Sequence, residues 1–267
     1  MKRRGLSLLL AVLTITLTAQ SYKDGLYFAQ DAQFGSSGWK EQVVIEVKGG
    51  KIVRVNWNAV NNLGVQDKKT YAASGMYGMA AKATQGEWDI QAKRVEEYLI
   101  KVQDPAQIAY KAKTGTTDVV SGATIHVNGF VELAKKALAG QPVRKGMYKK
   151  DGWFYAAATA FDKSGWKDTV LITVVNGTIV DVIWNALPSD PKGKSKLVSS
   201  IAGTYAMNGA QGAWHVQAER MQKTLVEKQN PALIPVRADG KTDAVSGVSI
   251  TVSGFLQLAA TALAGAK

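Results

Sequence analysis

The chain has 267 residues with 46% hydrophobic and 20% charged side chains, which is typical of a globular protein with a substantial core and excludes a disordered or collagen-like chain. It has no cysteine and only two histidines, which excludes disulfides, thiolate metal sites and iron–sulfur clusters and argues against a multi-haem protein, so any redox function would need an organic cofactor. The formal net charge of +12 comes from dispersed Lys and Arg residues, without the run of like charges or the basic helix that would indicate a nucleic-acid partner.

The first 21 residues have the pattern of an export signal. Residues 2–4 are basic, residues 5–19 form an uncharged, Leu-rich run, and Ala19 and Ser21 are small residues at the positions of a cleavage site. The apolar run is shorter than the roughly 18 residues of a spanning helix. We therefore expect cleavage after Ser21, with an uncleaved membrane anchor as the alternative.

Export would leave a basic protein outside the cytoplasm. Loss of Lys2, Arg3 and Arg4 lowers the formal charge from +12 to +9. Such a charge favours anionic lipid headgroups, cell-wall polymers or acidic redox partners. We expect a periplasmic, cell-envelope or extracellular location, where nucleic acid is a poor partner.

The rest of the chain contains one sequence pattern twice. The Thr-Asp-x-Val-Ser-Gly segment at residues 117–122 recurs at 242–247, and earlier segments recur at offsets of 125 to 127 residues. A repeat of this length is a whole domain, far longer than the roughly 20 to 50 residues of a solenoid unit. We therefore predict two tandem domains, residues 22–143 and residues 144–267.

Each copy begins with a hairpin pattern. Alternating segments flank Gly49-Gly50 in the first copy and Asn176-Gly177 in the second, and both dipeptides favour the positive φ angles of a tight turn. The alternating segments are residues 42–48, 51–57, 170–175 and 178–184.

Two apolar stripes at helical spacing follow in each copy. The first stripe is Trp88, Ala92, Val95 and Leu99, repeated as Trp214, Ala218, Met221 and Leu225. The second is Phe130, Ala134, Ala137 and Leu138, repeated as Phe255, Leu258, Ala259 and Leu263. Such stripes are core faces of helices, so we predict an α+β fold with an antiparallel sheet and packed helices in each domain.

A segment of small residues separates the two stripes in each copy, at 117–124 and 242–249. Glycine and small side chains let a bulky group approach the backbone, and the final hydroxyl of Thr124 or Ser249 offers an attachment or hydrogen-bonding atom. The following helix would point its N-terminal N–H groups at that spot, which suits a phosphate. A glycine turn that caps a helix is the alternative explanation.

Asp118–Thr124 resembles the D-x-x-[ST]-G-A-[ST] element of the FMN-binding domain family. That family includes the C subunit of the sodium-pumping NADH:quinone oxidoreductase, the G subunit of Rnf complexes and exported tandem-domain flavoproteins. The likeness covers nearly the whole chain after the signal, twice over. It implies that a flavin transferase, using FAD and a divalent metal, joins FMN through its phosphate to Thr124. In the second copy Val248 and Ser249 replace Ala and Thr, so the resemblance leaves a second FMN at Ser249 open.

The resemblance also implies the other cofactor-binding residues. They are Asp118, Ser121, Gly122, Ala123 and Thr124 in the first copy, and Asp243, Ser246, Gly247 and Ser249 in the second. The two aspartates would help the transferase or hold the turn through side-chain to backbone hydrogen bonds. Tyr77 and Tyr205, beside glycines, are expected to line a flavin pocket, whereas Trp88 and Trp214 have the spacing of core residues.

Together these features predict an exported electron-transfer flavoprotein. It would relay electrons from a membrane dehydrogenase or quinol-linked donor to an extracytoplasmic acceptor, with the flavin carrying the redox chemistry. Neither copy has a recognisable acid, base or nucleophile constellation, which favours a carrier over an enzyme. The alternatives are an exported module that binds flavin noncovalently and an extracytoplasmic flavin reductase.

Overall fold

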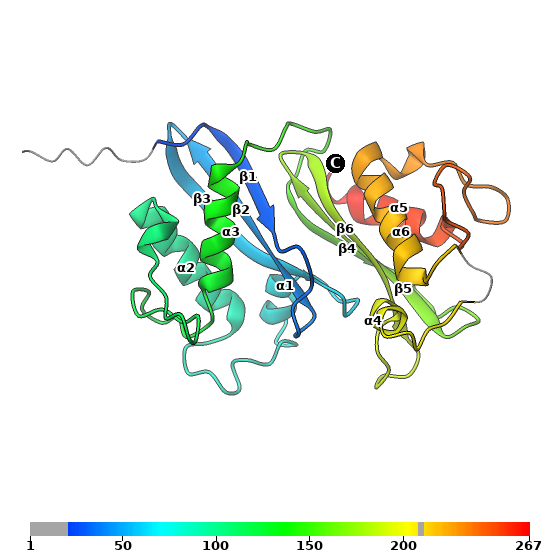
Figure 1. The fold of residues 1–267 in the computed structure, drawn as a ribbon, viewed down its shortest axis with the longest axis horizontal. Helices are drawn as coiled ribbons and strands as arrows, with labels where there is room; N and C mark the ends of the chain where they lie inside the picture. Colours follow the sequence, from blue (N-terminus) through cyan, green and yellow to red (C-terminus); the bar gives the residue numbers. More distant parts are fainter. Residues whose placement is uncertain (1–20, 208–210) are drawn as a thin grey trace, which may run out of the picture.

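The structure is a computed structural model that describes residues 21–207 and 211–267. Apart from Ser21, the predicted export signal lies outside the described residues. The fold is α+β, as predicted, with two three-stranded antiparallel sheets and helices covering one face of each (Figure 1). Within the described ranges, no helix is long and apolar enough to cross a membrane.

The two halves have the same order of elements. The first contains β1 (Gly25–Gln30), β2 (Trp39–Lys48), β3 (Lys51–Asn61), α1 (Lys68–Ala73), α2 (Trp88–Val102), the 3-10 helix η1 (Pro105–Gln107) and α3 (Asn128–Ala139). The second contains β4 (Gly152–Ala157), β5 (Trp166–Val175), β6 (Thr178–Pro188), α4 (Lys196–Ile201), α5 (Trp214–Lys228), the 3-10 helix η2 (Pro231–Leu233) and α6 (Ser253–Ala264). The strand orders are β1-β2-β3 and β4-β5-β6.

The predicted hairpins are confirmed. The turn between β2 and β3 holds Gly49 at φ 59° and Gly50 at φ 73°, and the turn between β5 and β6 holds Asn176 at φ 52° and Gly177 at φ 70°. Two successive positive φ angles match the right-handed twist of the flanking strands. These dipeptides therefore set the strand register in both sheets.

Both predicted helical stripes form the core. In the first half α2 packs on β3, while α3 packs on β1 and β2. The fully buried Trp57 indole lies between the rings of Trp88 and Phe130, with centroids 5.1 and 4.9 Å away. Trp184 lies in the same way between Trp214 and Phe255 in the second half. The expectation that Trp88 and Trp214 are core residues is confirmed.

The two sheets face each other between the outer pairs of helices, α2 with α3 and α5 with α6 (Figure 1). A buried ion pair joins Lys40 Nζ to Asp181 Oδ2 at 2.9 Å, and Gln42 Nε2 donates to the same oxygen at 2.9 Å. Gln42 Oε1 in turn accepts from Trp153 Nε1 at 2.6 Å. Val60, Leu171 and Ile183 form a small apolar cluster beside these polar groups.

Each half also has its own cluster of buried apolar residues, so we expect residues 22–143 and residues 144–267 to fold separately. Both segments should show cooperative thermal unfolding by circular dichroism. Their melting temperatures should lie below that of the full chain, because separation exposes the apolar cluster and breaks the Lys40–Asp181 pair. Non-cooperative melting of both segments, when the full chain melts cooperatively, would contradict two domains.

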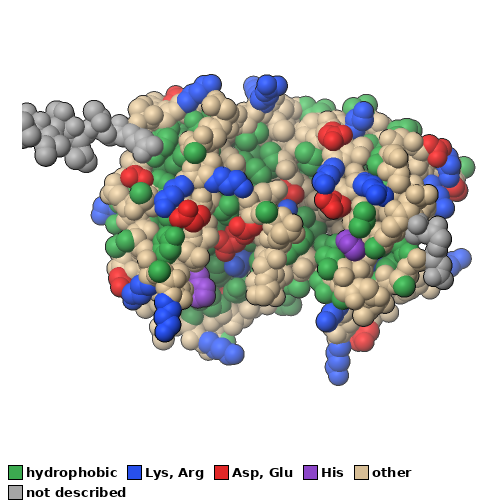
Figure 2. Space-filling view, in the orientation of Figure 1, with side chains coloured by type: hydrophobic (Ala, Val, Ile, Leu, Met, Phe, Trp, Pro, Cys, Tyr) green, Lys and Arg blue, Asp and Glu red, His purple; other side chains and the backbone are tan. Residues whose placement is uncertain are grey.

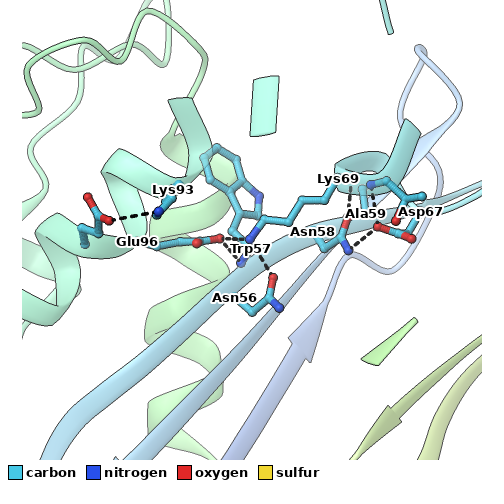
Figure 3. Close-up of polar contacts among 10 residues, drawn as sticks. Asn56, Trp57, Asn58, Ala59, Asp67, Lys69, Lys93 and Glu96 are labelled. Atoms are coloured by element: carbon cyan, nitrogen blue, oxygen red, sulfur yellow. Dashed lines mark hydrogen bonds and ion pairs between the residues drawn. The ribbon is translucent and has the colours of Figure 1, made fainter. Parts of the chain in front are cut away.

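A polar network fastens α1 and α2 to β3 in the first half (Figure 3). Glu96 Oε1 accepts from the backbone N–H of Trp57 and from Lys69 Nζ, both at 2.6 Å. Lys69 Nζ also donates to Asn56 Oδ1 at 2.8 Å. Burial raises the pKa of Glu96, and the neighbouring Lys69 ammonium opposes that rise.

In the second half the helix is held to the strand by uncharged side chains. Gln222 occupies the place of Glu96, and its Oε1 accepts from the backbone N–H of Trp184 at 2.9 Å. Leu197 occupies the place of Lys69. A buried ion pair can often be replaced by neutral groups of similar size. Since the second half makes this replacement and keeps the fold, we assign the Lys69–Glu96 pair a structural role.

Candidate functional site

The small-residue segment of the first half is a turn with an exposed hydroxyl at its end. Gly122 has φ 76°, and an added Cβ there would lie 3.0 Å from a guanidinium nitrogen of Arg94. Val120 and Ala123 are buried and anchor the turn, whereas Ser121 and Thr124 are exposed. The positive φ therefore favours glycine, and an added Cβ would also crowd the Arg94 guanidinium.

The hydroxyl of Thr124 is held by a buried amide. Gln91 of α2 is fully buried, and its Oε1 accepts from the backbone N–H of Thr124 at 2.8 Å and from Thr124 Oγ1 at 3.1 Å. The other end of the amide, Nε2, donates to the carbonyl of Gly86 at 3.0 Å. Gln91 thus fixes Thr124 relative to α2, while the side chain of Thr124 stays exposed to solvent.

Arg94 continues this support on the same face of α2, three residues after Gln91. Its Nη1 donates to the carbonyl of Gln85 at 2.7 Å and to the carbonyl of Gly122 at 2.6 Å. The two side chains form a clamp, hereafter the Gln91–Arg94 clamp, that binds the turn through backbone atoms.

The second half repeats the clamp. Gln217 Oε1 accepts from the backbone N–H of Ser249 at 2.8 Å and from Ser249 Oγ at 3.3 Å. Arg220 Nη1 donates to the carbonyl of Gly247 at 2.5 Å. The buried Val248 fits where Ala123 lies, without removing these contacts. Sequence reasoning missed the clamp, although a Gln-Ala-x-Arg pattern occurs in both copies.

The motif aspartates do not form the expected side-chain to backbone turn. Their side chains are 75% and 76% exposed, and Asp118 pairs with Lys111 at 2.9 Å while Asp243 pairs with Arg237 at 2.9 Å. Thr117 makes the local bonds instead: its Oγ1 donates to the carbonyl of Ala109 at 2.6 Å and accepts from the N–H of Val119 at 3.2 Å. The aspartates therefore lie on the surface, each in an exposed ion pair.

The helix after the turn also differs from the expectation. α3 begins at Asn128, beyond Thr124, and the N–H groups of Val127 and Asn128 donate to the carbonyl of Gly115. A carboxylate of the chain lies at the first turn of α3, because an added Cβ on Gly129 would be 2.7 Å from Glu41 Oε2. Negative charge near a helix N-terminus is favourable, and at α3 the nearby carboxylate is that of Glu41.

At the start of α1 a lysine lies among three aromatic rings. Lys68 Nζ is 5.9 Å from the ring centroid of Trp39, 5.3 Å from that of Tyr77 and 4.1 Å from that of Trp88. We call Lys68 and these three rings the lysine cage. Lys68 is only 6% exposed, and burial lowers its pKa to about 8, with the Glu41 carboxylate opposing the fall.

An equivalent cage occurs in the second half. Lys196 Nζ is 5.6 Å from the ring centroid of Trp166, 4.8 Å from that of Tyr205 and 5.2 Å from that of Trp214. Tyr77 and Tyr205, predicted to line a pocket, thus belong to the two cages rather than to the turns. Among the described residues, neither cage lysine has a hydrogen-bond or ion-pair partner.

Each cage also has a nearby carboxylate. Glu41 Oε2 accepts from Trp57 Nε1 at 3.3 Å, and burial raises the pKa of Glu41 to about 6, against the opposing effect of Lys68. In the second half Asp168 takes this place, and burial raises its pKa. Trp184 Nε1 lies near this shorter carboxylate and limits the rise of its pKa, without a close hydrogen bond in the described part of the chain.

Stability should therefore depend on pH through Glu41. Well below pH 4.5, the ordinary pKa, the Glu41 carboxyl is protonated in the folded and the unfolded chain and does not change the free energy of unfolding. Between pH 4.5 and about 6 it ionises in the unfolded chain first, which favours unfolding. Above that range this effect lowers the free energy of unfolding of the wild type by about 2 kcal/mol, whereas the uncharged Glu41→Gln protein has no such loss. Urea unfolding of both proteins at about pH 4 and pH 7 measures this gain, and equal differences at the two pH values would contradict it.

The charged surface is mixed. Figure 2 shows Lys and Arg side chains scattered over the visible face with acidic groups between them. Within residues 21–207 and 211–267, no group of three or more His, Asp or Glu side chains is arranged to hold a metal ion.

Comparison with known proteins identifies the first half. Residues 38–139 match the FMN-binding domain family. A Clostridium thermocellum protein with a solution NMR structure is 48% identical, over 45% of this chain and 95% of that protein, with a TM-score of 0.36. A Clostridium perfringens protein with a crystal structure is 27% identical, over 44% of this chain and 87% of that protein, with a TM-score of 0.33. No curated protein matches the chain.

Proposed function

Because the chain belongs to the FMN-binding domain family through residues 38–139, we propose that it is an exported electron-transfer flavoprotein that carries FMN covalently on Thr124. The observation that carries this proposal is the Thr124 hydroxyl, which is exposed at the end of the turn yet fixed by Gln91 at 3.1 Å. An attachment atom needs both properties: access for a second protein and a defined position.

The attachment chemistry needs little from this chain beyond that hydroxyl. A transferase using FAD and a divalent metal would join Thr124 Oγ1 to the phosphorus of the FMN moiety, with AMP leaving and the hydroxyl proton passing to a base of the transferase. The exposed Asp118 and Lys111 beside the turn offer charged groups for recognition by that enzyme.

The residues around the turn suit the flavin itself. Tyr77, the half-buried member of the lysine cage, offers an aromatic face to a planar ring, and Lys68 offers N–H donors with no partner in the described residues. Bound FMN would supply the redox chemistry. The chain would supply tethering, orientation and electrostatics.

The second half supports a second flavin on the same chain. Ser249 Oγ keeps the bond to Gln217, though it is longer at 3.3 Å, and Val248 adds a β-branched side chain beside it. We therefore expect partial or absent modification of Ser249 compared with Thr124. Two flavins would form a short relay from a membrane dehydrogenase or quinol-linked donor to an extracytoplasmic acceptor.

Export is proposed from residues 1–21 alone. N-terminal sequencing of the protein from the native envelope should begin at Tyr22. A chain that begins at Met1 and fractionates as an integral membrane protein would replace cleavage with a membrane anchor.

Intact-mass measurement tests the flavin itself. The mature protein made with a flavin transferase should be heavier by one or two FMN groups than the protein made without it. An unchanged mass, with yellow colour lost on denaturation, would make the protein a noncovalent flavin-binding module instead.

A further inference from the structure

In the described part of the chain, the lysine cages lack the hydrogen-bond acceptor that a buried structural lysine normally has. Lys68 is 6% exposed, and its ammonium has no hydrogen-bond or ion-pair partner among the described residues. Removing most of the water from an ammonium that has no acceptor is costly, although the Nζ atom itself is not sealed from solvent. The aromatic faces around it, the nearest 4.1 Å away, offset part of that cost but accept no conventional hydrogen bond.

The two lysines at the start of α1 differ in whether the second half retains them. Lys69, which has the partner Glu96, is replaced by Leu197 in the second half, and Glu96 by Gln222. Its neighbour Lys68, which has no such partner, is kept as Lys196. The lysine with a hydrogen-bonded partner is thus replaced in the second half, whereas the cage lysine is retained, buried as Lys68 and half-buried as Lys196.

The cage lies beside the attachment atom. Trp88 contacts Lys68 at the start of α2, and Gln91, which holds Thr124, follows three residues later, about 4.5 Å along the helix axis. Tyr77, only partly buried, forms the outer side of the cage. A planar group tethered to Thr124 would therefore approach the cage at this end of α2 from the side of Tyr77, because Trp39 and Trp88 are buried.

We propose that Lys68 is the cation that faces the flavin in the first half and holds its reduction potential up, and that Lys196 does the same in the second. This inference rests on the proposed FMN attachment. Bound FMN takes two electrons from the donor and one proton from water, which leaves a negative charge on its pyrimidine ring. An ammonium at that ring favours the reduced form, and the carboxylate of Glu41, which interacts with Lys68, opposes it.

Removing the charge of Lys68 and removing that of Glu41 should shift the reduction potential in opposite directions, which gives a specific test. In a Ser249→Ala background, which limits the protein to the Thr124 flavin, spectroelectrochemical titration measures the potential. Lys68→Met should move it to more negative values, with at least about a tenfold loss of preference for reduced flavin, or about 30 mV for a two-electron couple. Glu41→Gln should move it to more positive values, and Lys68→Arg should stay near the parent.

Two controls separate this effect from net charge and from local packing. Lys93→Met removes one exposed charge from α2, and the Lys69→Leu, Glu96→Gln pair installs the second half's own residues at the neighbouring position. Both should keep the parent potential.

Three results would overturn the inference. One is a folded, FMN-bearing Lys68→Met protein at the parent potential, and another is a shift of the same sign in Lys68→Met and Glu41→Gln. If Lys68→Met does not fold, an unshifted or negative potential in Glu41→Gln decides against it. Intact mass distinguishes the other failure, because a parent without FMN would overturn the proposed function and this inference with it.

Discussion

Thr124→Ala should abolish covalent FMN on the first half while leaving the fold unchanged. The substitution removes the Oγ1 that would join the flavin phosphate and deletes one exposed hydroxyl, whose hydrogen bond in the described part of the chain is to Gln91 at 3.1 Å. The backbone N–H of Thr124, which donates to the same amide at 2.8 Å, is kept, so we expect a loss of about 1 kcal/mol or less in unfolding free energy. Peptide mass spectrometry after coexpression with the transferase measures the modification.

Neighbouring hydroxyls provide the controls for this assignment. Thr124→Ser keeps the attachment oxygen and should still carry FMN, and Ser121→Ala should also do so, although the transferase could act more slowly. Ser249→Ala should remove only the second-half modification. FMN found on the first-half peptide of Thr124→Ala protein would move the assignment to Ser121 or Thr117.

The parts of the fold that depend on local chemistry could be predicted from the sequence. The turn dipeptides Gly49-Gly50 and Asn176-Gly177 mark the hairpins, because few residue pairs tolerate two positive φ angles. The stripe of Trp88 and its helical neighbours marks α2, because spacing alone shows which face is apolar.

The remaining parts depend on which surfaces meet. β1 has only Tyr27 and Ala29 buried, so its alternation is too weak to indicate a strand. Gln42 and Thr173 have the polar character of a solvent-exposed face, yet both are buried because the other sheet covers them. No local pattern records the packing of one sheet on another.

The site divides in the same way. Thr124 could be predicted because a motif and a repeat both pointed to it. Gln91 and Arg94 bind backbone atoms of a turn about 30 residues away, a contact that no local pattern specifies. Lys68 meets Trp39 and Trp88 only after the sheet and α2 have come together. For these residues the usable signal was their recurrence in the second copy.

Gln91→Leu should produce the second large effect, by freeing the Thr124 hydroxyl and destabilising the first half. The substitution leaves the N–H of Thr124 and the carbonyl of Gly86 without their partners, which should cost about 2 kcal/mol or more in unfolding free energy. Loss of the fixed hydroxyl position should slow FMN attachment at Thr124 about tenfold, the equivalent of about 1.4 kcal/mol in the barrier. Denaturant unfolding and timed peptide mass spectrometry measure the two effects.

The second half supplies the matched control for Gln91→Leu. Gln217 holds Ser249 with the same bonds at 2.8 and 3.3 Å, so Gln217→Leu should destabilise the protein by a similar amount yet leave attachment at Thr124 at the wild-type rate. A general loss of stability would slow the first-half reaction in both variants, whereas a local clamp slows it only in Gln91→Leu. If Gln91→Leu protein loses stability but acquires FMN on Thr124 at the wild-type rate, the amide holds the turn and has no part in presenting the hydroxyl.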